Sequence, residues 1–269
     1  MGFAIITSKE DPASMNIMTH LLKIISFSQE GIFQNNPVFV SGNSCIYTIN
    51  GSLVHAENLD KEIDADYFVF ASKHRSREAV PSLCCHVIGN WAEADLGGAS
   101  RTLVKAPALI LRQAFLSLQA GQAKVPSHQI TLEATHHGPL LDKPVLFLEV
   151  GSSPEFWVHK EAAEVVAEAI NNILTKPDVK ERPIAIGIGG PHYASNFNKV
   201  LERTDICIGH ICPKHMLSFL DEEMIQQALH ASGASSAILD WKGMGKEKDR
   251  IKQLLDDMRI PYVRVDKII

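Results

Sequence analysis

Strand and helix signals alternate through the second half of the chain, from residue 129 to residue 265. Short apolar runs typical of buried strands are followed by longer segments whose apolar residues recur at helical spacing. This order predicts an α/β sheet with helices on both faces. The predicted strands cover 129–134, 145–150, 183–188, 205–208, 236–240 and 261–265, and the predicted helices cover 160–174, 194–202, 220–231 and 246–258.

The first half of the chain carries a less regular version of this pattern. Asp11-Pro12 is a typical helix start, an N-cap followed by proline at the first helical position, and predicts a helix over 12–27. Asn50-Gly51 is a strong hairpin signal that leads into 53–55. Residues 89–107 lack periodicity and are expected to form a loop. The remaining predictions are strands at 3–7, 38–40, 45–49, 66–71 and 85–88 and a helix at 108–118.

These elements predict a three-layer α/β/α fold with a mixed sheet and an N-terminal hairpin, formed by residues 1–269 as a single α/β catalytic domain. With 45% hydrophobic residues, the chain can build a sizeable core. No stretch approaches roughly 18 uninterrupted apolar residues, so no membrane helix is expected.

The net charge and the cysteines limit the possible functions and the possible cellular compartments of the protein. A net charge of −5 argues against a nonspecific nucleic-acid coat, although it is compatible with a local basic groove. The five cysteines form no C-x-x-C pair, and the start of the chain lacks the pattern of a secretory signal. We expect a cytoplasmic monomer without an obligate protein partner.

Histidines placed just after predicted strands are the main candidates for chemistry. His74, His136-His137, His192 and His210 each follow a short apolar run within a few residues. Open α/β sheets build their ligand crevice from residues past the carboxyl ends of strands. Because imidazole can carry a proton near neutral pH or bind a metal, this placement favours an enzyme.

Two carboxylates accompany these histidines. Adjacent residues on a strand point to opposite faces, so His136 and His137 can share a ligand only if the strand has ended, as Gly138-Pro139 indicates. Glu133 can orient an imidazole or bind metal. Glu149 ends another predicted strand and can act as a general base or orient a histidine; a loop that caps a helix is the alternative.

Three further segments have weaker patterns. Gly189-Gly190 follows a strand and precedes a helix, a position where backbone amides can hold an anion, although a tight turn would look the same. Lys73-His74-Arg75 is a basic cluster that either binds an anion or is solvated. The ligand-type residues from Cys207 to His215 are too close together for a closed structural zinc site, so His210 alone is the better candidate.

Six segments, in order along residues 3 to 265, resemble the D-aminoacyl-tRNA deacylase family of archaeal and plant type. The resemblance implies hydrolysis of the ester that joins a D-amino acid to the 3′ acceptor end of tRNA, zinc dependence, and a fold similar to the phosphorylase/peptidyl-tRNA-hydrolase type. The matching segments are Asp11–Ile17, Ala71–Ser76, Leu132–Pro139, Phe147–Ser152, Gly189–Ala194, and Gly209-His210 with Pro213-Lys214.

With this resemblance, the candidate residues take provisional roles. The expected metal ligands are His136, His137, His192 and His210, and the expected catalytic residues are His136, His137, Glu149 and His192. Substrate binding is expected from Lys73, His74, Arg75, Gly189, Gly190 and Lys214. Two alternatives stay open: a zinc-dependent peptidase or amidohydrolase that acts on small substrates, and a tRNA-binding module without catalysis.

Overall fold

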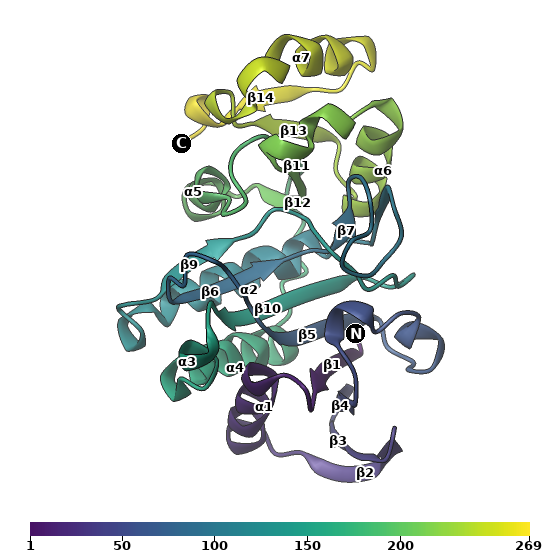
Figure 1. The fold of residues 1–269 in the computed structure, drawn as a ribbon, viewed down its shortest axis with the longest axis vertical. Coiled ribbons are helices and arrows are strands. Elements are labelled where there is room, and N and C mark those ends of the chain that lie inside the picture. The colour runs from purple at the N-terminus through teal and green to yellow at the C-terminus, as the bar shows by residue number, and fades with distance from the viewer.

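A mixed eight-stranded sheet forms the larger part of the structure, a computed structural model that describes residues 1–269 (Figure 1). Its strand order is β2-β3-β4-β1-β5-β10-β6-β9. In the middle of the sheet β10 pairs in parallel with β5 and antiparallel with β6. The strands are β1 (Phe3–Ser8), β2 (Ser28–Phe33), β3 (Asn36–Ser41), β4 (Ser44–Ile49), β5 (Tyr67–Lys73), β6 (Ser82–His86), β9 (Gln129–Leu132) and β10 (Val145–Gly151).

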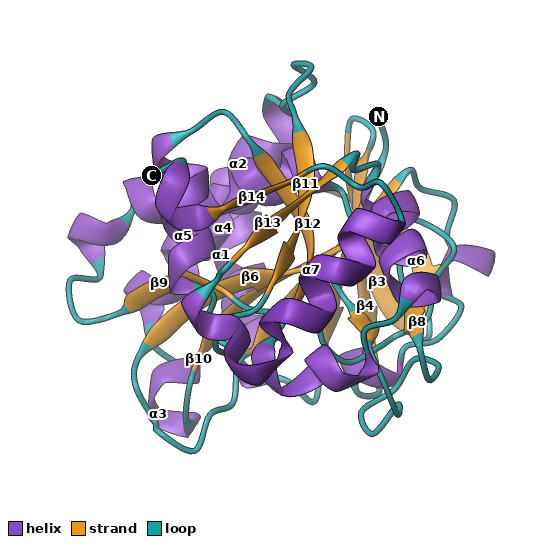
Figure 2. Cartoon of the chain, turned by 90° about the horizontal axis from the view of Figure 1, so that it is seen from above, coloured by secondary structure: helices purple, strands orange, loops and turns teal.

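A second, parallel sheet is built from the C-terminal part of the chain. Its order is β12-β11-β13-β14, and it lies at the opposite end of the long axis from the N-terminal hairpin (Figure 1). Figure 2 looks along that axis onto the end that carries this sheet. A two-stranded ribbon of β7 (Gly89–Asn90) and β8 (Thr102–Leu103) makes a third, small sheet. The C-terminal strands are β11 (Ile184–Ile188), β12 (Cys207–Cys212), β13 (Ser236–Leu239) and β14 (Tyr262–Arg264).

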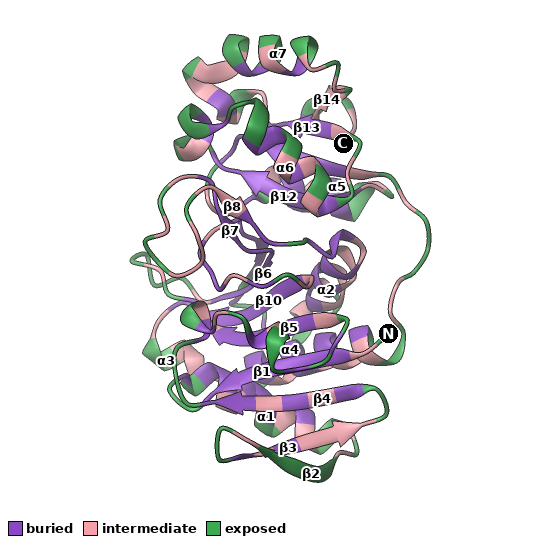
Figure 3. Cartoon of the chain, turned by 90° about the vertical axis from the view of Figure 1, so that its right-hand side faces the viewer, coloured by how far each residue is buried: buried purple, intermediate pink, exposed green.

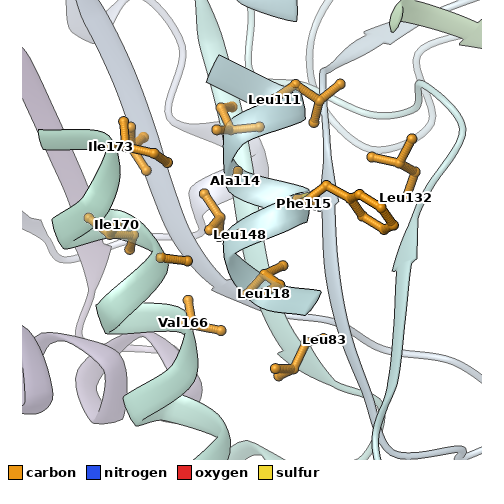
Figure 4. Close-up of a cluster of buried hydrophobic side chains, with 14 of the residues drawn as sticks. Leu83, Leu111, Ala114, Phe115, Leu118, Leu132, Leu148, Val166, Ile170 and Ile173 are labelled. Carbon is orange, nitrogen blue, oxygen red and sulfur yellow. The ribbon is translucent and has the colours of Figure 1, made fainter. Parts of the chain in front are cut away.

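Three helices cover one face of the large sheet: α1 (Pro12–Ile24), α2 (Ala108–Ala120) and α4 (Lys160–Thr175). The Asp11 carboxylate caps α1 by accepting a hydrogen bond from the Ser14 amide at 3.0 Å. Helices α2 and α4 lie side by side, and their apolar side chains meet over Leu83, Leu132 and Leu148 (Figure 4). Helices α5 (Ser195–Arg203), α6 (Glu222–Ser232) and α7 (Lys248–Asp257) accompany the smaller sheet, and α3 (Pro154–Trp157) follows β10.

The opposite face of the large sheet has its own core. Side chains alternate along β10, so Leu148 faces the helices while Phe147 stacks on Phe70 at 4.6 Å on the other side. Short 3-10 turns at Leu53–His55 and Leu59–Lys61 cover this second face. Glu149 lies two residues after Phe147 and therefore points to the same side. The central strands are buried, whereas β2 at the edge is exposed (Figure 3).

The predicted mixed α/β class is confirmed, and most elements lie within three residues of their predicted bounds. The hairpin prediction at Asn50-Gly51 is wrong, because β4 ends there and the chain enters a 3-10 turn. The N-terminal hairpin turns are at Gln34-Asn35, both with left-handed backbone, and at Gly42-Asn43. None of the helices combines the length with the apolar composition that a membrane span requires.

Candidate functional site

Histidines and carboxylates from five strands and the loops that follow them meet on one face of the large sheet, the face to which Phe147 points. Three of the strands, β5, β6 and β10, lie side by side in the sheet, and the loop after β11 reaches the same place. The loop after β9 is held there by backbone pairing of Glu133 with Tyr193 and of His136 with Ile88. The site consists of His74, His86, Glu133, His136, His137, Glu149 and His192.

Glu133 is the centre of this cluster. Its Oε1 lies 2.9 Å from His74 Nδ1 and 3.6 Å from His192 Nε2. Its Oε2 lies 3.7 Å from His86 Nε2 and 3.8 Å from His136 Nε2. Glu149 Oε2 approaches two of these four rings, at 3.4 Å from His74 Nδ1 and 3.8 Å from His86 Nε2. Two buried carboxylates are therefore surrounded by imidazoles.

Three of the imidazoles are oriented alike. The Nδ1 atoms of His86, His136 and His137 lie 3.2, 2.9 and 2.5 Å from the backbone carbonyls of Val87, Ala134 and Gly138. A carbonyl can only accept, so each Nδ1 carries a proton, and Nε2 keeps a lone pair whenever the ring is neutral. This is the arrangement that orients metal-binding histidines. Burial opposes charge on His86, but Glu149 and Glu133 outweigh this and raise its pKa, so a metal at this ring would replace the Nε2 proton.

The backbone after β9 explains how two adjacent histidines can share one site. The strand ends at Leu132, and His137 has a left-handed backbone with φ 47°. This conformation is uncommon outside glycine and is typical of functional sites. As a result, the rings of His136 and His137 lie 4.3 Å apart instead of on opposite faces.

Burial and charge fix the protonation of the cluster. Burial lowers the pKa of His137 to about 4, with a contribution from the nearby His86, and holds the pKa of His136 well below its usual range. Burial also opposes charge on His74, but its contacts with Glu133 and Glu149 outweigh this and raise its pKa to about 11. Contacts with His74 and His86 overcome burial and lower the pKa of Glu149 to about 2.

The donor set fits a divalent metal. Neither Glu133 carboxylate oxygen nor His86 Nε2 has a well-aligned hydrogen-bond partner, although all three atoms are buried. Buried polar atoms are rarely left in this state. Ligand atoms lie within 4.8 Å of one another in four overlapping sets: His86 with His136 and His137; His74 with Cys84 and Glu133; Glu133 with His136 and His192; and His86 with Glu133 and Glu149.

A pocket of about 380 Å³ opens onto the cluster. It is the size of a small-molecule site. Its wall contains the predicted substrate-binding residues Lys73, His74 and Arg75. Lys73 Nζ lies 5.5 Å from the centre of the Trp157 ring, a cation–π contact that holds the side chain at the rim. The lining consists of Ser8, Glu10, Asp11, Ser52, Leu53, Val54, Ser72, Lys73, His74, Arg75, Leu96, His136, His137, Glu149 and His192.

His74 is buried, whereas a solvated basic cluster would leave it exposed. The side chain is 6% exposed, and its Nε2 lies 2.7 Å from the Tyr193 hydroxyl. Gly151 permits this position, because a Cβ there would lie 2.6 Å from the Cβ of His74. The ring therefore connects Tyr193 to both buried carboxylates.

His210 is not a metal ligand in this structure, which corrects the sequence-based assignment. Strand β12 runs on to Cys212, so His210 lies inside a buried strand instead of beyond its end. Its Nε2 donates to the Val104 carbonyl at 2.9 Å, and its Nδ1 lies 3.1 Å from the Thr135 hydroxyl. Both ring nitrogens are occupied by protein groups.

A structural role for His210 predicts a specific pH dependence. Burial lowers its pKa to about 4, from about 6.5 in the unfolded chain. Below pH 6.5 the unfolded state binds a proton that the folded state excludes, so folding free energy is lost progressively down to about pH 4. Between about pH 7.5 and about pH 5, the free energy of unfolding of wild type should therefore fall by about 2 kcal/mol more than that of His210→Gln. Denaturant unfolding measures this.

The same variant separates a structural His210 from a catalytic one. At neutral pH the folded His210→Gln protein should keep the activity of the histidine cluster within about threefold of wild type, because His210 touches none of the site residues. A loss of activity as large as that caused by removing a site histidine would contradict the correction.

The glycine loop does not form the expected anion site. The Gly189 amide donates to the Cys212 carbonyl at 2.8 Å and the Gly190 amide donates to the Gly243 carbonyl at 3.3 Å, so neither is free to bind a ligand. Gly189 and Gly190 instead make a tight turn that leads to His192. Lys214 lines a separate hollow of about 490 Å³ with Gly190 and His215, outside the pocket that holds the cluster.

His86 was missed by the sequence analysis. It ends strand β6 directly after Cys84-Cys85, and β6 runs antiparallel to β10. The signal was available, since His86 follows an apolar run in the same manner as His74. The antiparallel pairing that brings His86 next to Phe147 and Glu149 could not be deduced from that run.

Comparisons with known proteins identify the family. The profile of the family described as D-aminoacyl-tRNA deacylase matches residues 61–263. A protein named D-aminoacyl-tRNA deacylase from Thermococcus onnurineus is 36% identical over 97% of this chain and 98% of its own length. The protein of the same name from Pyrococcus abyssi is 33% identical with the same coverage.

The fold has a close counterpart among solved structures. A crystal structure described as a conserved protein of unknown function superposes with a TM-score of 0.92 at 28% identity, covering 99% of this chain and 96% of that one. The sequence relatives and this structural match both span nearly the whole chain, including every site residue described above. The chain therefore belongs to the D-aminoacyl-tRNA deacylase family.

Proposed function

We propose that this protein hydrolyses the ester bond of D-aminoacyl-tRNA, releasing a free D-amino acid and tRNA. The observation that carries the proposal is the buried Glu133 carboxylate, ringed by four histidines at the base of the pocket, in a chain of this family. The aminoacylated 3′ end of tRNA is the proposed substrate, and the cytoplasm, where tRNA is used, is the proposed location.

The ligands for a zinc ion would come from the oriented imidazoles. His86, His136 and His137 present Nε2 lone pairs, and Glu133 adds a carboxylate that lacks an aligned partner. A bound zinc ion would supply a positive charge beside the ester carbonyl and a lower pKa for water.

The remaining residues handle protons and charge. His192 is 39% exposed at its side chain, the largest exposure among the cluster histidines that approach Glu133. Its Nε2 faces Glu133 Oε1 at 3.6 Å, so we assign it to take a proton from water and return it to the departing ribose oxygen. His74 holds Glu133 and Glu149 in place through one ring nitrogen.

Deacylation of matched D- and L-aminoacyl-tRNA by the purified protein tests the proposal. We expect release of the D-amino acid and little release of the L-amino acid. Free D-amino-acid esters form the third arm, because a zinc-dependent peptidase or amidohydrolase would prefer such small substrates. Equal turnover of D- and L-aminoacyl-tRNA, or none, would refute the proposal.

Metal removal gives a separate prediction. Treatment with a chelator should reduce deacylation by at least about 100-fold, because the charge beside the ester carbonyl is lost. Addition of zinc should restore the activity, and metal analysis of the purified protein should find zinc. Full activity in metal-free protein would exclude the assigned zinc role while leaving the ester hydrolysis itself standing.

A further inference from the structure

A second, polar groove adjoins the catalytic pocket. It has a volume of about 580 Å³ and is lined by Arg75, Ser76, Arg77, Ser152, Ser153 and Pro154. Arg75 also lines the pocket that holds the histidine cluster, so the two hollows share one wall.

The groove is built by the strands that carry the site. One side follows β5 directly after His74, and the other begins at Ser152, directly after β10 and three residues after Glu149. Ser152 joins the two sides: its carbonyl accepts from the Ser76 amide at 3.1 Å, and its hydroxyl donates to the Val80 carbonyl at 2.7 Å. The groove is therefore held in a fixed position relative to the histidine cluster.

The chemistry of the lining suits an anion. Neither Arg75 nor Arg77 has an acidic partner, in contrast to Arg101, which pairs with Asp221 at 2.8 Å. Two free guanidinium groups on one wall of the groove match the acceptor oxygens of a phosphate.

We infer that this groove binds the phosphate backbone of the tRNA acceptor end, next to the terminal adenosine whose ester lies in the catalytic pocket. Arg75 would contact the phosphate nearest the pocket, and Arg77 the next one along the strand. The inference rests on the proposed function, because it places the reacting ester at the histidine cluster. It explains how an acidic protein can bind a polyanion through a local patch.

Two substrates separate phosphate binding from catalysis. D-aminoacyl-tRNA carries the backbone phosphates, whereas 3′-O-D-aminoacyl-adenosine carries the same ester without them. For Arg77→Gln we expect the KM for the tRNA substrate to rise about tenfold, while kcat/KM for the adenosine ester changes by less than about twofold. Arg203→Gln, which removes an exposed arginine at the end of α5, is the matched control and should change neither.

Binding of deacylated tRNA tests the groove independently of activity. Each lost contact with a single-stranded phosphate should reduce the slope of log K against log salt by about 0.7. Arg77→Gln should show this change and Arg203→Gln should not. An unchanged salt slope, or an equal loss on both ester substrates, would overturn the groove assignment. Failure of wild type to hydrolyse either ester would instead overturn the proposed function.

Discussion

Replacement of His136 with alanine is expected to reduce deacylation of D-aminoacyl-tRNA by about 10³-fold or more. His136 belongs to two of the possible metal-ligand sets and lies 3.8 Å from Glu133 Oε2. Its Nδ1 is tied to the Ala134 carbonyl, so the Nε2 lone pair is aimed into the site. Single-turnover kinetics on a D-aminoacyl-tRNA would measure the loss directly.

The His136→Ala variant should still fold and still bind tRNA. The side chain is 30% exposed at the pocket, so truncation leaves the core intact. The proposed phosphate contacts lie elsewhere, and the Kd for deacylated tRNA should change by less than about threefold. Near wild-type activity, or a protein that fails to fold, would refute the role given to this histidine.

Glu133→Gln should cause a loss of similar size for a different reason. The change keeps the shape of the side chain but removes the negative charge at the centre of the cluster. Zinc affinity should fall by about 10- to 100-fold or more, and deacylation by about 10³-fold at limiting zinc. Isothermal titration with zinc and kinetics at several zinc concentrations would measure both effects.

The fold should tolerate Glu133→Gln. Removal of one partner from a buried ion pair normally costs about 3–5 kcal/mol. Here Glu149 Oε2 lies 3.4 Å from the same His74 nitrogen and continues to balance its charge. Glu161→Gln, at an exposed carboxylate 3.5 Å from His159, is the matched control and should leave zinc affinity and activity unchanged. Zinc binding that is unaffected by Glu133→Gln would remove this carboxylate from the metal site.

Sequence patterns located much of the site because catalytic side chains sit at strand ends, and strand ends can be read from apolar runs. His136, His137, His192 and Glu149 were found in this way, and all four line the pocket. The resemblance to the deacylase family, read from six separated segments, is confirmed by the family profile and by full-length relatives.

The wrong predictions for His210 and for the Gly189-Gly190 loop have one cause, which is backbone pairing between segments that are distant in the sequence. β12 continues to Cys212 because β11 offers a partner up to Ile188, and this extension places His210 inside the sheet. The amides of Gly189 and Gly190 cannot bind an anion because they donate hydrogen bonds to the carbonyls of Cys212 and Gly243, which belong to other segments of the chain. No local pattern reports whether a backbone amide will find such a partner.

Local sequence patterns were enough to establish the mixed α/β class, the helix capped by Asp11 and the strand ends that carry most of the histidines. Local periodicity and capping decide these features, because they depend on neighbours along the chain. The three-dimensional arrangement of the strands was needed to show that His86 completes the cluster, that Glu133 is its centre and that His210 is structural. Those outcomes depend on which strands pair and in which direction, and the pairing is set by packing over the whole molecule.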